Sequence, residues 1–130
     1  MKAITSERKK AVAAADREFS RFIRARDGRC VTCGTTERLQ CGHLFSRSNY
    51  SLRWDERNAY CQCASCNMRH EYDPAPLTMY YLSLYSQEDL DKLHAEWRKS
   101  SKLTTAEIRE IAAEYRSRWG KGINRRWRNP

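Results

Sequence analysis

The chain has 130 residues, 40% of them hydrophobic, which suits one compact domain with a modest core. Lys and Arg number 25 against 16 Asp and Glu, and the formal net charge of +9 favours a polyanionic partner such as nucleic acid, unless it serves solubility alone. No run of about eighteen apolar residues is present, and charges interrupt the N-terminal segment where a signal peptide needs an apolar core. We therefore expect a cytoplasmic protein with reduced thiols and no membrane partner.

The first predicted element is a helix over residues 6–26, which "DGRC" ends at Gly28. Apolar residues recur along it every three or four positions, and charged residues occupy the other face. The apolar stripe consists of Val12, Ala15, Phe19, Phe22 and Ile23.

The spacing of the six cysteines indicates a metal site. "CVTCG" and "CASCN" are two C-x2-C pairs, which supply four thiolates to one tetrahedral Zn2+ through tight knuckle turns, the first closed with the help of Gly34. Disulfides and idle core cysteines are the alternatives, but a reducing cytosol disfavours disulfides. Cys41 and Cys61 remain, and we expect them to pack in the core, with ligand exchange at Cys61 left open. The predicted zinc ligands are Cys30, Cys33, Cys63 and Cys66.

The segment between the two knuckles is predicted to form a β-hairpin followed by a helix. The strands are placed around "RLQCGHLF" and "RNAYCQC", and the polar stretch "SRSNYSLRWDE" forms a long loop between them. "ASCNMRHEY" has helical character and stops before "DPAP", where Pro74 and Pro76 break a continuous helix. Zinc would therefore pin the two ends of a hairpin-and-helix unit.

The C-terminal half is predicted to be helical over residues 75–119. Ser86 with Asp89, and Thr104 with Glu107, are capping arrangements that open the second and third of its helices. The basic tail over 121–130 either contacts phosphates and stacks on a base or is a frayed, solubilising end. The expected buried faces contain Leu90, Leu93 and Trp97, then Ile108, Ile111, Ala112, Tyr115 and Trp119.

The order C-x2-C, "GH", Asn58, "CASCN" and His70 resembles the HNH, or ββα-metal, nuclease motif in its zinc-knuckle form. The resemblance implies that His43 is the general base, that Asn58 on the second strand holds the loop, and that Asn67 binds a catalytic Mg2+ or Mn2+. His70 lies three residues after Asn67 on the same helical face, so both are expected to reach one ion. A lone histidine is more often structural, which is the alternative for His43.

One position departs from that motif. Many HNH enzymes carry Asp or His directly before the base, where this chain has Gly42. Asp55 is the nearest carboxylate in the motif region and is the candidate substitute, although it equally suits a cap or a partner for Arg53 or Arg57.

A closer resemblance is to the phage lambda NinG (Rap) family of recombination nucleases. It rests on "CVTCGT", "GHLFSR", "LRWDERN", "QCASCN" and "SQEDLDKL", and covers residues 10 to 118. It implies a phage endonuclease, in the cytoplasm of the bacterial host, that cuts branched recombination intermediates such as Holliday junctions and D-loops. The resemblance makes a second copy of the chain and phage recombination proteins candidate partners, with the C-terminal helices as a candidate dimer surface; the alternative is that these helices pack on the domain's own core.

We therefore expect an α+β, mostly helical domain over residues 1–120, with a zinc-pinned ββα-metal core over 29–73 between an N-terminal helix and C-terminal helices. The predicted function is metal-dependent DNA hydrolysis, and the alternative is a non-enzymatic zinc-containing DNA-binding module. Binding should be led by phosphate contacts. The arginines expected to make them are Arg47, Arg53, Arg57, Arg69, Arg125 and Arg126, supported by a basic face on the first helix with Lys9, Lys10, Arg17, Arg21 and Arg24.

Overall fold

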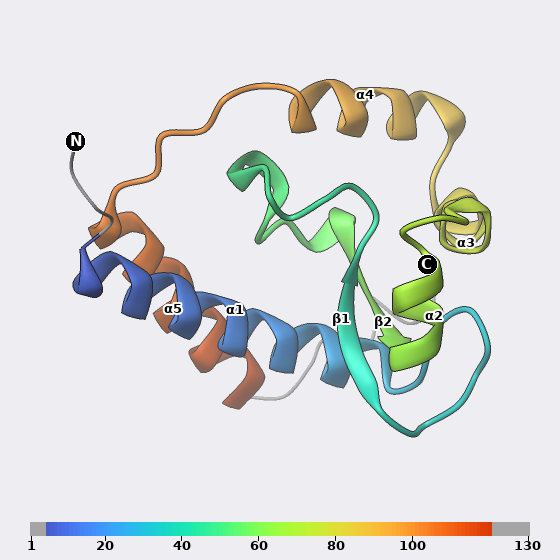
Figure 1. Ribbon diagram of the computed structural model, residues 1–130, viewed down its shortest axis with the longest axis horizontal. Coiled ribbons are helices and arrows are strands. Elements are labelled where there is room, and N and C mark those ends of the chain that lie inside the picture. The colour runs from blue at the N-terminus through green and yellow to red at the C-terminus, as the bar shows by residue number, and fades with distance from the viewer. Residues whose placement is uncertain (1–4, 121–130) are drawn as a thin grey trace.

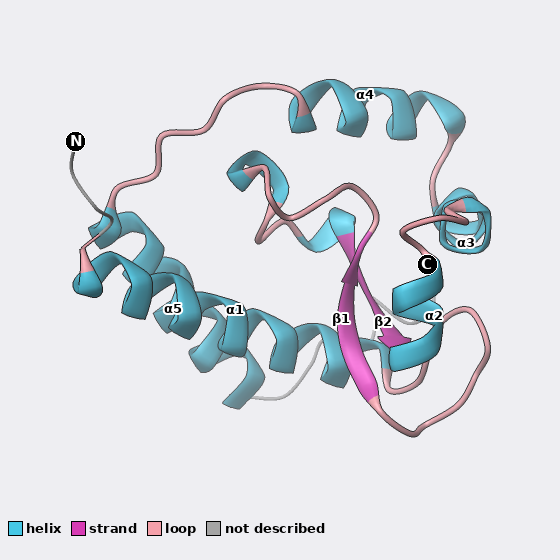
Figure 2. Cartoon of the chain, in the orientation of Figure 1, coloured by secondary structure: helices cyan, strands magenta, loops and turns pink. Residues whose placement is uncertain are grey.

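The computed structural model describes residues 5–120, apart from the side chains of residues 119 and 120. Helices dominate, and one antiparallel pair of strands completes the fold, which confirms the mostly helical α+β class (Figures 1 and 2). The predicted tail over 121–130, with Arg125 and Arg126, lies outside the described residues. In chain order the elements are α1 (Ser6–Asp27), β1 (Leu39–His43), the 3-10 helices η1 (Tyr50–Leu52) and η2 (Glu56–Asn58), β2 (Ala59–Cys63), α2 (Ala64–Arg69), α3 (Ala75–Leu84), α4 (Gln87–Trp97) and α5 (Thr105–Gly120).

Helices α1 and α5 lie side by side and run in the same direction (Figure 1). Their first turns meet where Arg8 Nη1 lies 3.5 Å from Thr105 Oγ1, and their later turns meet where Arg116 pairs with Glu18. The predicted stripe of α1 faces this interface, with Val12 only half-buried at its edge, while the side chain predicted at Trp119 lies outside the described part. The buried contacts involve Ala11, Ala15, Phe19, Phe22, Ile23, Ile108, Ala112 and Tyr115.

Local signals set the helix boundaries where the sequence predicts them. Gly28 ends α1 with a φ of 76°, in the left-handed region that glycine tolerates best. At the start of α5, Thr104 and Glu107 form the predicted capping box, with reciprocal hydrogen bonds of 3.1 and 2.8 Å. A second capping box joins Ser86 and Asp89 at the start of α4.

The hairpin lies between α1 and α2 (Figure 1). Strands β1 and β2 pair antiparallel, with Cys41 opposite Cys61. The end of α1 is fastened to β2 because the buried Arg26 donates to the Ala59 carbonyl at 2.7 Å and the Asp27 carboxylate accepts from the Cys61 amide at 2.9 Å. These hydrogen bonds add to the apolar contact that Ala59 and Cys41 of the hairpin make with the core between α1 and α5.

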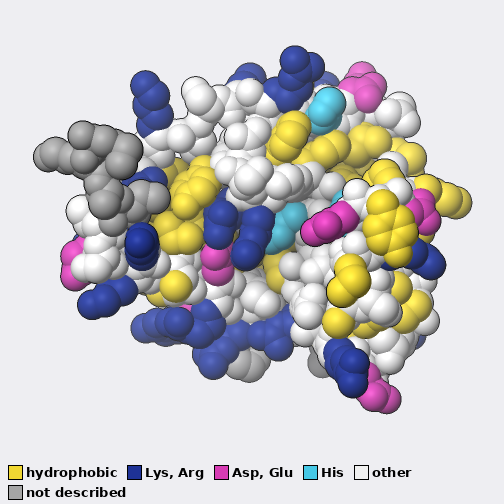
Figure 3. Space-filling model, viewed as in Figure 1, with side chains coloured by type: hydrophobic (Ala, Val, Ile, Leu, Met, Phe, Trp, Pro, Cys, Tyr) yellow, Lys and Arg dark blue, Asp and Glu magenta, His cyan; other side chains and the backbone are white. Residues whose placement is uncertain are grey.

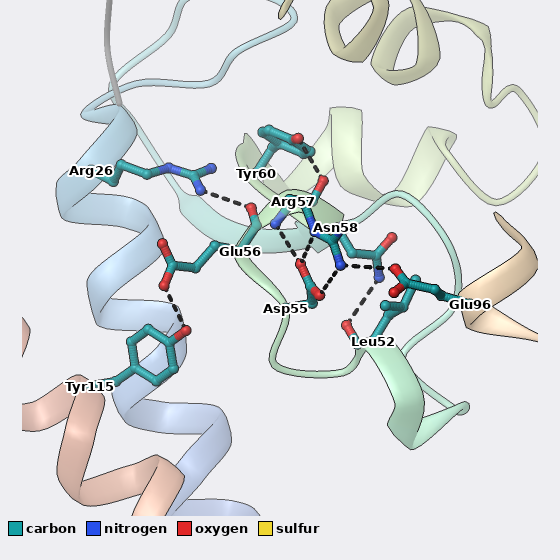
Figure 4. Close-up of polar contacts among 9 residues, drawn as sticks. All are labelled: Arg26, Leu52, Asp55, Glu56, Arg57, Asn58, Tyr60, Glu96 and Tyr115. Atoms are coloured by element: carbon teal, nitrogen blue, oxygen red, sulfur yellow. Dashed lines mark hydrogen bonds and ion pairs between the residues drawn. The ribbon is translucent and has the colours of Figure 1, made fainter. Parts of the chain in front are cut away.

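The loop between the strands is ordered by polar contacts around η2 (Figure 4). Arg26 donates to the Glu56 carbonyl at 2.9 Å, and the Tyr115 hydroxyl donates to the Glu56 carboxylate at 2.8 Å. Arg57 binds Asp55 and, across the loop, Glu96 of α4. The loop therefore connects α1 and α5 on one side with α4 on the other.

Helices α3 and α4 cover the other side of the hairpin with a second apolar cluster. Pro76 lies in the first turn of α3, a position that proline tolerates because that amide has no helical partner. Among residues 5–120, no helix is both long and apolar enough to cross a membrane. The buried members of this cluster are Leu44, Leu52, Tyr60, Leu77, Tyr81 and Leu93.

Replacing Ile108 with alanine should destabilise the fold by about 2–5 kcal/mol, because its side chain is fully buried between α1 and α5 and the change leaves a cavity. Urea unfolding followed by circular dichroism measures this loss. Ile111→Ala, at a half-buried position of the same helix, is the matched control and should lower the free energy of unfolding clearly less. Equal losses for the two variants would contradict the core assignment.

Candidate metal centre and the adjoining cleft

The four cysteines of the two C-x2-C pairs converge on one point, as predicted. All their sulfur atoms lie within 4.8 Å of one another. Cys33 Sγ and Cys63 Sγ are 3.7 Å apart, close to the roughly 3.8 Å expected between ligands of tetrahedral zinc with Zn–S bonds of about 2.3 Å. The geometry and the donor set both fit a structural zinc ion held by Cys30, Cys33, Cys63 and Cys66.

Two tight turns place these sulfur atoms. In the first, the Gly34 amide donates to the Cys30 carbonyl at 2.9 Å, and Gly34 takes a φ of 84°, as its predicted role requires. In the second, Cys63 is the N-cap of α2, and its sulfur accepts from the Cys66 amide. The Val31 amide also donates to the Cys61 carbonyl, which joins the first turn to β2.

The surroundings favour a thiolate at two of the four cysteines. At Cys30, partial burial opposes ionisation, but hydrogen bonds from Thr32 and from backbone amides outweigh it and lower the pKa to about 6. At Cys63, hydrogen bonds from Ser65 and the Cys66 amide lower the pKa. A lowered pKa helps zinc binding, because thiolate is the form that coordinates the metal.

Cys41 and Cys61 do not belong to this cluster. Burial raises the pKa of each thiol to about 12, so both are neutral and packed in the fold. Cys61 is fully buried, and Cys41 packs beside the α1–α5 core. The expectation of a packing role for both is consistent with these positions.

A cleft of about 950 Å3 runs along β1 between α1 and α2. It opens on the face shown in Figure 3, where Lys and Arg side chains gather at the lower left over α1 and α5. Three elements that are far apart in sequence therefore share this cleft. The polar residues that line it include Asp16, Ser20, Arg24, Gln40, His43, Ser46, Arg47, Asn67, His70 and Glu71.

His43 lies at the end of β1 in this cleft. Its Nε2 atom is 2.9 Å from the Arg53 carbonyl, which can only accept a hydrogen bond, so Nε2 carries the proton when the ring is neutral. Nδ1 has no hydrogen-bond partner among residues 5–120 and is not enclosed. Desolvation lowers the pKa of His43, the nearby Arg47 adds to this, and the Arg53 carbonyl and Asp16 oppose it. His43 therefore presents a neutral ring with an open proton acceptor.

Asp16, a residue that the sequence did not indicate, fixes the backbone that orients His43. Its carboxylate accepts from Arg53 Nε at 3.0 Å, from Arg53 Nη2 at 2.7 Å and from Trp54 Nε1 at 3.0 Å. The Arg53 guanidinium also lies near the Tyr50 and Trp54 rings. The Arg53 carbonyl is thus held at a defined place beside His43.

Asn58 fastens the start of the loop that follows His43. It is fully buried and ends η2, one residue before β2, rather than lying within the strand as expected. Its amide binds both backbone groups of Phe45 at 2.9 Å and donates to the Leu52 carbonyl at 3.2 Å (Figure 4). A side chain that satisfies three backbone groups holds the two ends of this loop together.

Asn67 and His70 lie across the cleft from α1, on and directly after α2. His70 Nε2 is 2.9 Å from the Leu44 carbonyl, and its Nδ1 is buried without a hydrogen-bond partner. Asn67 Nδ2 donates to Gln40, which leaves its oxygen free to accept. An unpartnered ring nitrogen and an amide oxygen that line the same cleft are both ligand types that a divalent cation accepts.

The glycine that departs from the HNH motif has a steric explanation. A Cβ atom at Gly42 would clash with Gln62 Oε1 and lie 2.9 Å from Asn67 Oδ1. Asp55, the predicted substitute carboxylate, binds Arg57 and does not line the cleft (Figure 4). Asp16 and Glu71 do line it, and Glu71 directly follows His70.

The predicted DNA-binding arginines occupy different settings. Arg47 lines the cleft and is exposed. Arg53 is mostly buried, and its three guanidinium nitrogens donate to Asp16 and to the Arg47 carbonyl. Arg57 is paired with two carboxylates, and Arg69 lies exposed 4.0 Å from Asp73. Only Arg47 of these four contributes to the cleft, where the structure adds Arg24 of α1.

The fold and the site define a small α+β protein in which four converging cysteines, able to hold a zinc ion, lie at one end of a hairpin and helix beside an open cleft. Residues 1–124 match the sequence family described as Bacteriophage Lambda NinG protein, so the chain belongs to the NinG family.

Individual relatives agree with this assignment. The chain is 30% identical over 109 residues to protein ninG of Escherichia phage 933W, an alignment that covers 80% of this chain and 54% of that protein. Proteins ninG of Salmonella phage P22 and Escherichia phage lambda are also 30% identical over 109 residues, with 80% and 53% covered. The chain thus spans about half the length of these relatives. No solved structure matches it.

We predict one zinc ion per chain and its loss in Cys63→Ser, because serine removes one of the four thiolates. Elemental analysis of protein after gel filtration gives the stoichiometry. Cys41→Ser, which changes a thiol outside the cluster, is the matched control and should keep its zinc. Zinc loss in the control, or full retention in Cys63→Ser, would refute the assignment.

Proposed function

We propose that this protein is a metal-dependent DNA endonuclease with His43 as its general base. The observation that carries the proposal is the setting of His43, which lines the cleft with its Nε2 held by the Arg53 carbonyl and its Nδ1 without a hydrogen bond to any residue in the range 5–120. A general base needs this combination of a fixed tautomer and a free acceptor nitrogen.

The arrangement around His43 supports an HNH-type assignment. The hairpin presents the histidine at the end of its first strand, Asn58 holds the loop that follows, and α2 places Asn67 and His70 at the same cleft. His43, Asn67 and His70 thus share one cleft, as the proposed motif requires, whereas Asn58 holds the loop from η2 and not from the second strand. Gly42 replaces the usual acidic residue, and Glu71 is the cleft carboxylate nearest to His70 in sequence.

The reaction requires a proton acceptor beside the scissile phosphate. His43 Nδ1 takes a proton from a water molecule as the water oxygen bonds to phosphorus, and the phosphorus–oxygen bond to the leaving group breaks on the opposite side. The leaving oxygen is protonated from solvent. Asp16 supports this step indirectly, because it holds the residue whose carbonyl orients His43.

Asn67 and His70 are proposed to hold Mg2+ or Mn2+ through Oδ1 and Nδ1. When bound, such an ion stabilises negative charge on the phosphate and the leaving oxygen. The Leu44 carbonyl would keep the His70 proton on Nε2 and so leave Nδ1 unprotonated. The zinc ion proposed at the four cysteines would be fully coordinated by sulfur and therefore structural.

DNA binding is proposed to follow the basic surface beside the cleft. Arg24 and Arg47 line the cleft itself, and the exposed Arg17 and Arg21 lie on the same helix as Arg24. These side chains can contact phosphates but offer no recognisable pattern for base edges, so affinity should fall steeply with salt. Branched recombination intermediates are the proposed substrates, on the strength of the resemblance to recombination nucleases.

We predict that His43→Ala lowers Mg2+-dependent cleavage of a labelled four-way junction by roughly 100-fold or more, because the reaction loses its proton acceptor. Gel electrophoresis of the cleavage products measures the rate. Zinc content and thermal unfolding serve as controls and should stay close to those of the wild type.

Two outcomes would contradict the nuclease proposal. Wild-type protein that cleaves neither the junction nor linear duplex with Mg2+ or Mn2+ would favour the alternative, a zinc-containing module that binds DNA without cutting it. Cleavage by His43→Ala at the wild-type rate would exclude His43 as the base.

The pH dependence of cleavage should report the lowered pKa of His43. A base with a lowered pKa is already unprotonated at lower pH, so kcat/KM should rise with pH and reach half of its plateau below pH 6.5, the ordinary pKa of histidine. Arg47→Ala removes a cation that lowers this pKa and should shift the rise to higher pH. Arg109→Ala on α5 is the control and should leave the pH midpoint of cleavage unchanged. A midpoint well above pH 6.5 in the wild type would contradict a neutral, desolvated base.

A further inference from the structure

Three aromatic rings form a cluster next to the cleft. The Phe45 and His94 ring centroids are 4.9 Å apart, those of His94 and Trp97 are 5.8 Å apart, and those of Phe45 and Trp97 are 5.9 Å apart. Their planes are inclined to one another by only 29°, 16° and 31°. We call Phe45, His94 and Trp97 the aromatic platform. Two of the three pairs are stacked, and a further flat ring can add to such a stack.

Hydrogen bonds to the loop after β1 hold the platform rigid. Trp97 Nε1 donates to the Ser46 carbonyl at 2.8 Å. The Trp97 carbonyl accepts from Asn49 Nδ2 at 2.5 Å and from Ser51 Oγ at 2.9 Å. A ring that is fixed before binding loses little conformational entropy when a ligand stacks on it.

His94 of the platform is open to solvent, and two exposed cations follow Trp97 in the chain. His94 is exposed, and its imidazole makes no hydrogen bond to any residue in the range 5–120. Arg98 and Lys99, which follow Trp97, are exposed and form no ion pair within the described chain. An exposed ring beside unpaired cations suits a planar ligand that carries negative charge nearby.

The platform is continuous with the proposed active site. Leu44, Ser46 and Arg47 line the cleft, and Phe45 lies between them in the chain. Helix α4, which carries the other two rings, borders the upper edge of the face onto which the cleft opens (Figure 1). Figure 3 shows a histidine beside hydrophobic side chains at that edge, with Lys and Arg side chains above them. A nucleic-acid strand in the cleft can therefore continue onto the platform.

We propose that the aromatic platform binds an unpaired nucleobase of the DNA substrate by stacking on His94. In continuous duplex each base is stacked and paired, so its flat faces are not available, whereas a branch point or single-stranded segment has bases free to turn outward. The platform would thus favour DNA with unpaired bases over intact duplex. This inference rests on the proposed function, which supplies DNA as the substrate. It adds that the protein recognises an unpaired base of that DNA.

The experiment compares binding of two strands that carry the same phosphates and differ only in their bases. A labelled oligothymidine and an abasic strand of equal length are titrated with intact protein in buffer without added Mg2+ or Mn2+, and fluorescence anisotropy gives both dissociation constants. Stacking of one base predicts that wild type prefers oligothymidine by about fivefold or more. His94→Ala should lose most of this preference even though Phe45 and Trp97 remain, and His94→Phe should keep it because it retains a ring at this position.

Lys92→Ala is the matched control, since it removes an exposed cation from the same helix and should weaken binding of both strands alike. Equal binding of the two strands by the wild type, or an unchanged preference in His94→Ala, would overturn the platform. Because no cleavage is involved, a preference that depends on His94 stands even if the junction assay shows no nuclease activity. If the wild type cleaves DNA but binds the two strands equally, the proposed platform is refuted and the proposed nuclease activity stands.

Discussion

Two short segments of the chain, separated by 29 residues, meet where the thiols of Cys30, Cys33, Cys63 and Cys66 converge. Four sulfur atoms so close together repel one another as thiolates, and a bound zinc ion turns this repulsion into a strong tether. Such an ion would fix two junctions of the chain, the one between α1 and the hairpin and the one between β2 and α2. With these two junctions fixed, the cleft between α1 and α2 has defined walls, although the hairpin itself has only two strands.

Charged groups supplement the apolar contact where the hairpin meets α1. Arg26 donates to backbone carbonyls of η2 and β2, Asp27 accepts from a backbone amide of β2, and Asp16 accepts from the side chains of Arg53 and Trp54. Each of these groups is costly to desolvate alone, so each depends on the others for its stability. These contacts also fix the positions of the side chains closely, because a bidentate contact tolerates little displacement. The position of the His43 ring is fixed in turn, because its Nε2 bonds to the Arg53 carbonyl.

The proposed metal site and the aromatic platform lie at opposite ends of the short segment that follows β1. His70 binds the Leu44 carbonyl, and Trp97 binds the Ser46 carbonyl. Asn58, through its bonds to Phe45, fixes the residue between them. One buried amide thus sets the position of both features relative to His43, which explains why a long loop can carry a precise site.

The sequence by itself determined the features that depend on local chemistry. The C-x2-C spacing predicted the four cysteines that converge, and Gly28, Ser86 and Thr104 marked helix ends correctly, because capping and turn formation involve neighbours in the chain. The resemblance of the motifs predicted that His43, Asn67 and His70 serve one site, and all three line the same cleft. Only the tertiary structure decided the role of Asp16, the pairing of Asp55 and Arg57 away from the cleft, and the assembly of Phe45 with His94 and Trp97. Apart from the local Asp55–Arg57 pair, these contacts join residues at least 37 positions apart in the chain. No periodicity or spacing encodes which side chains meet across such a distance.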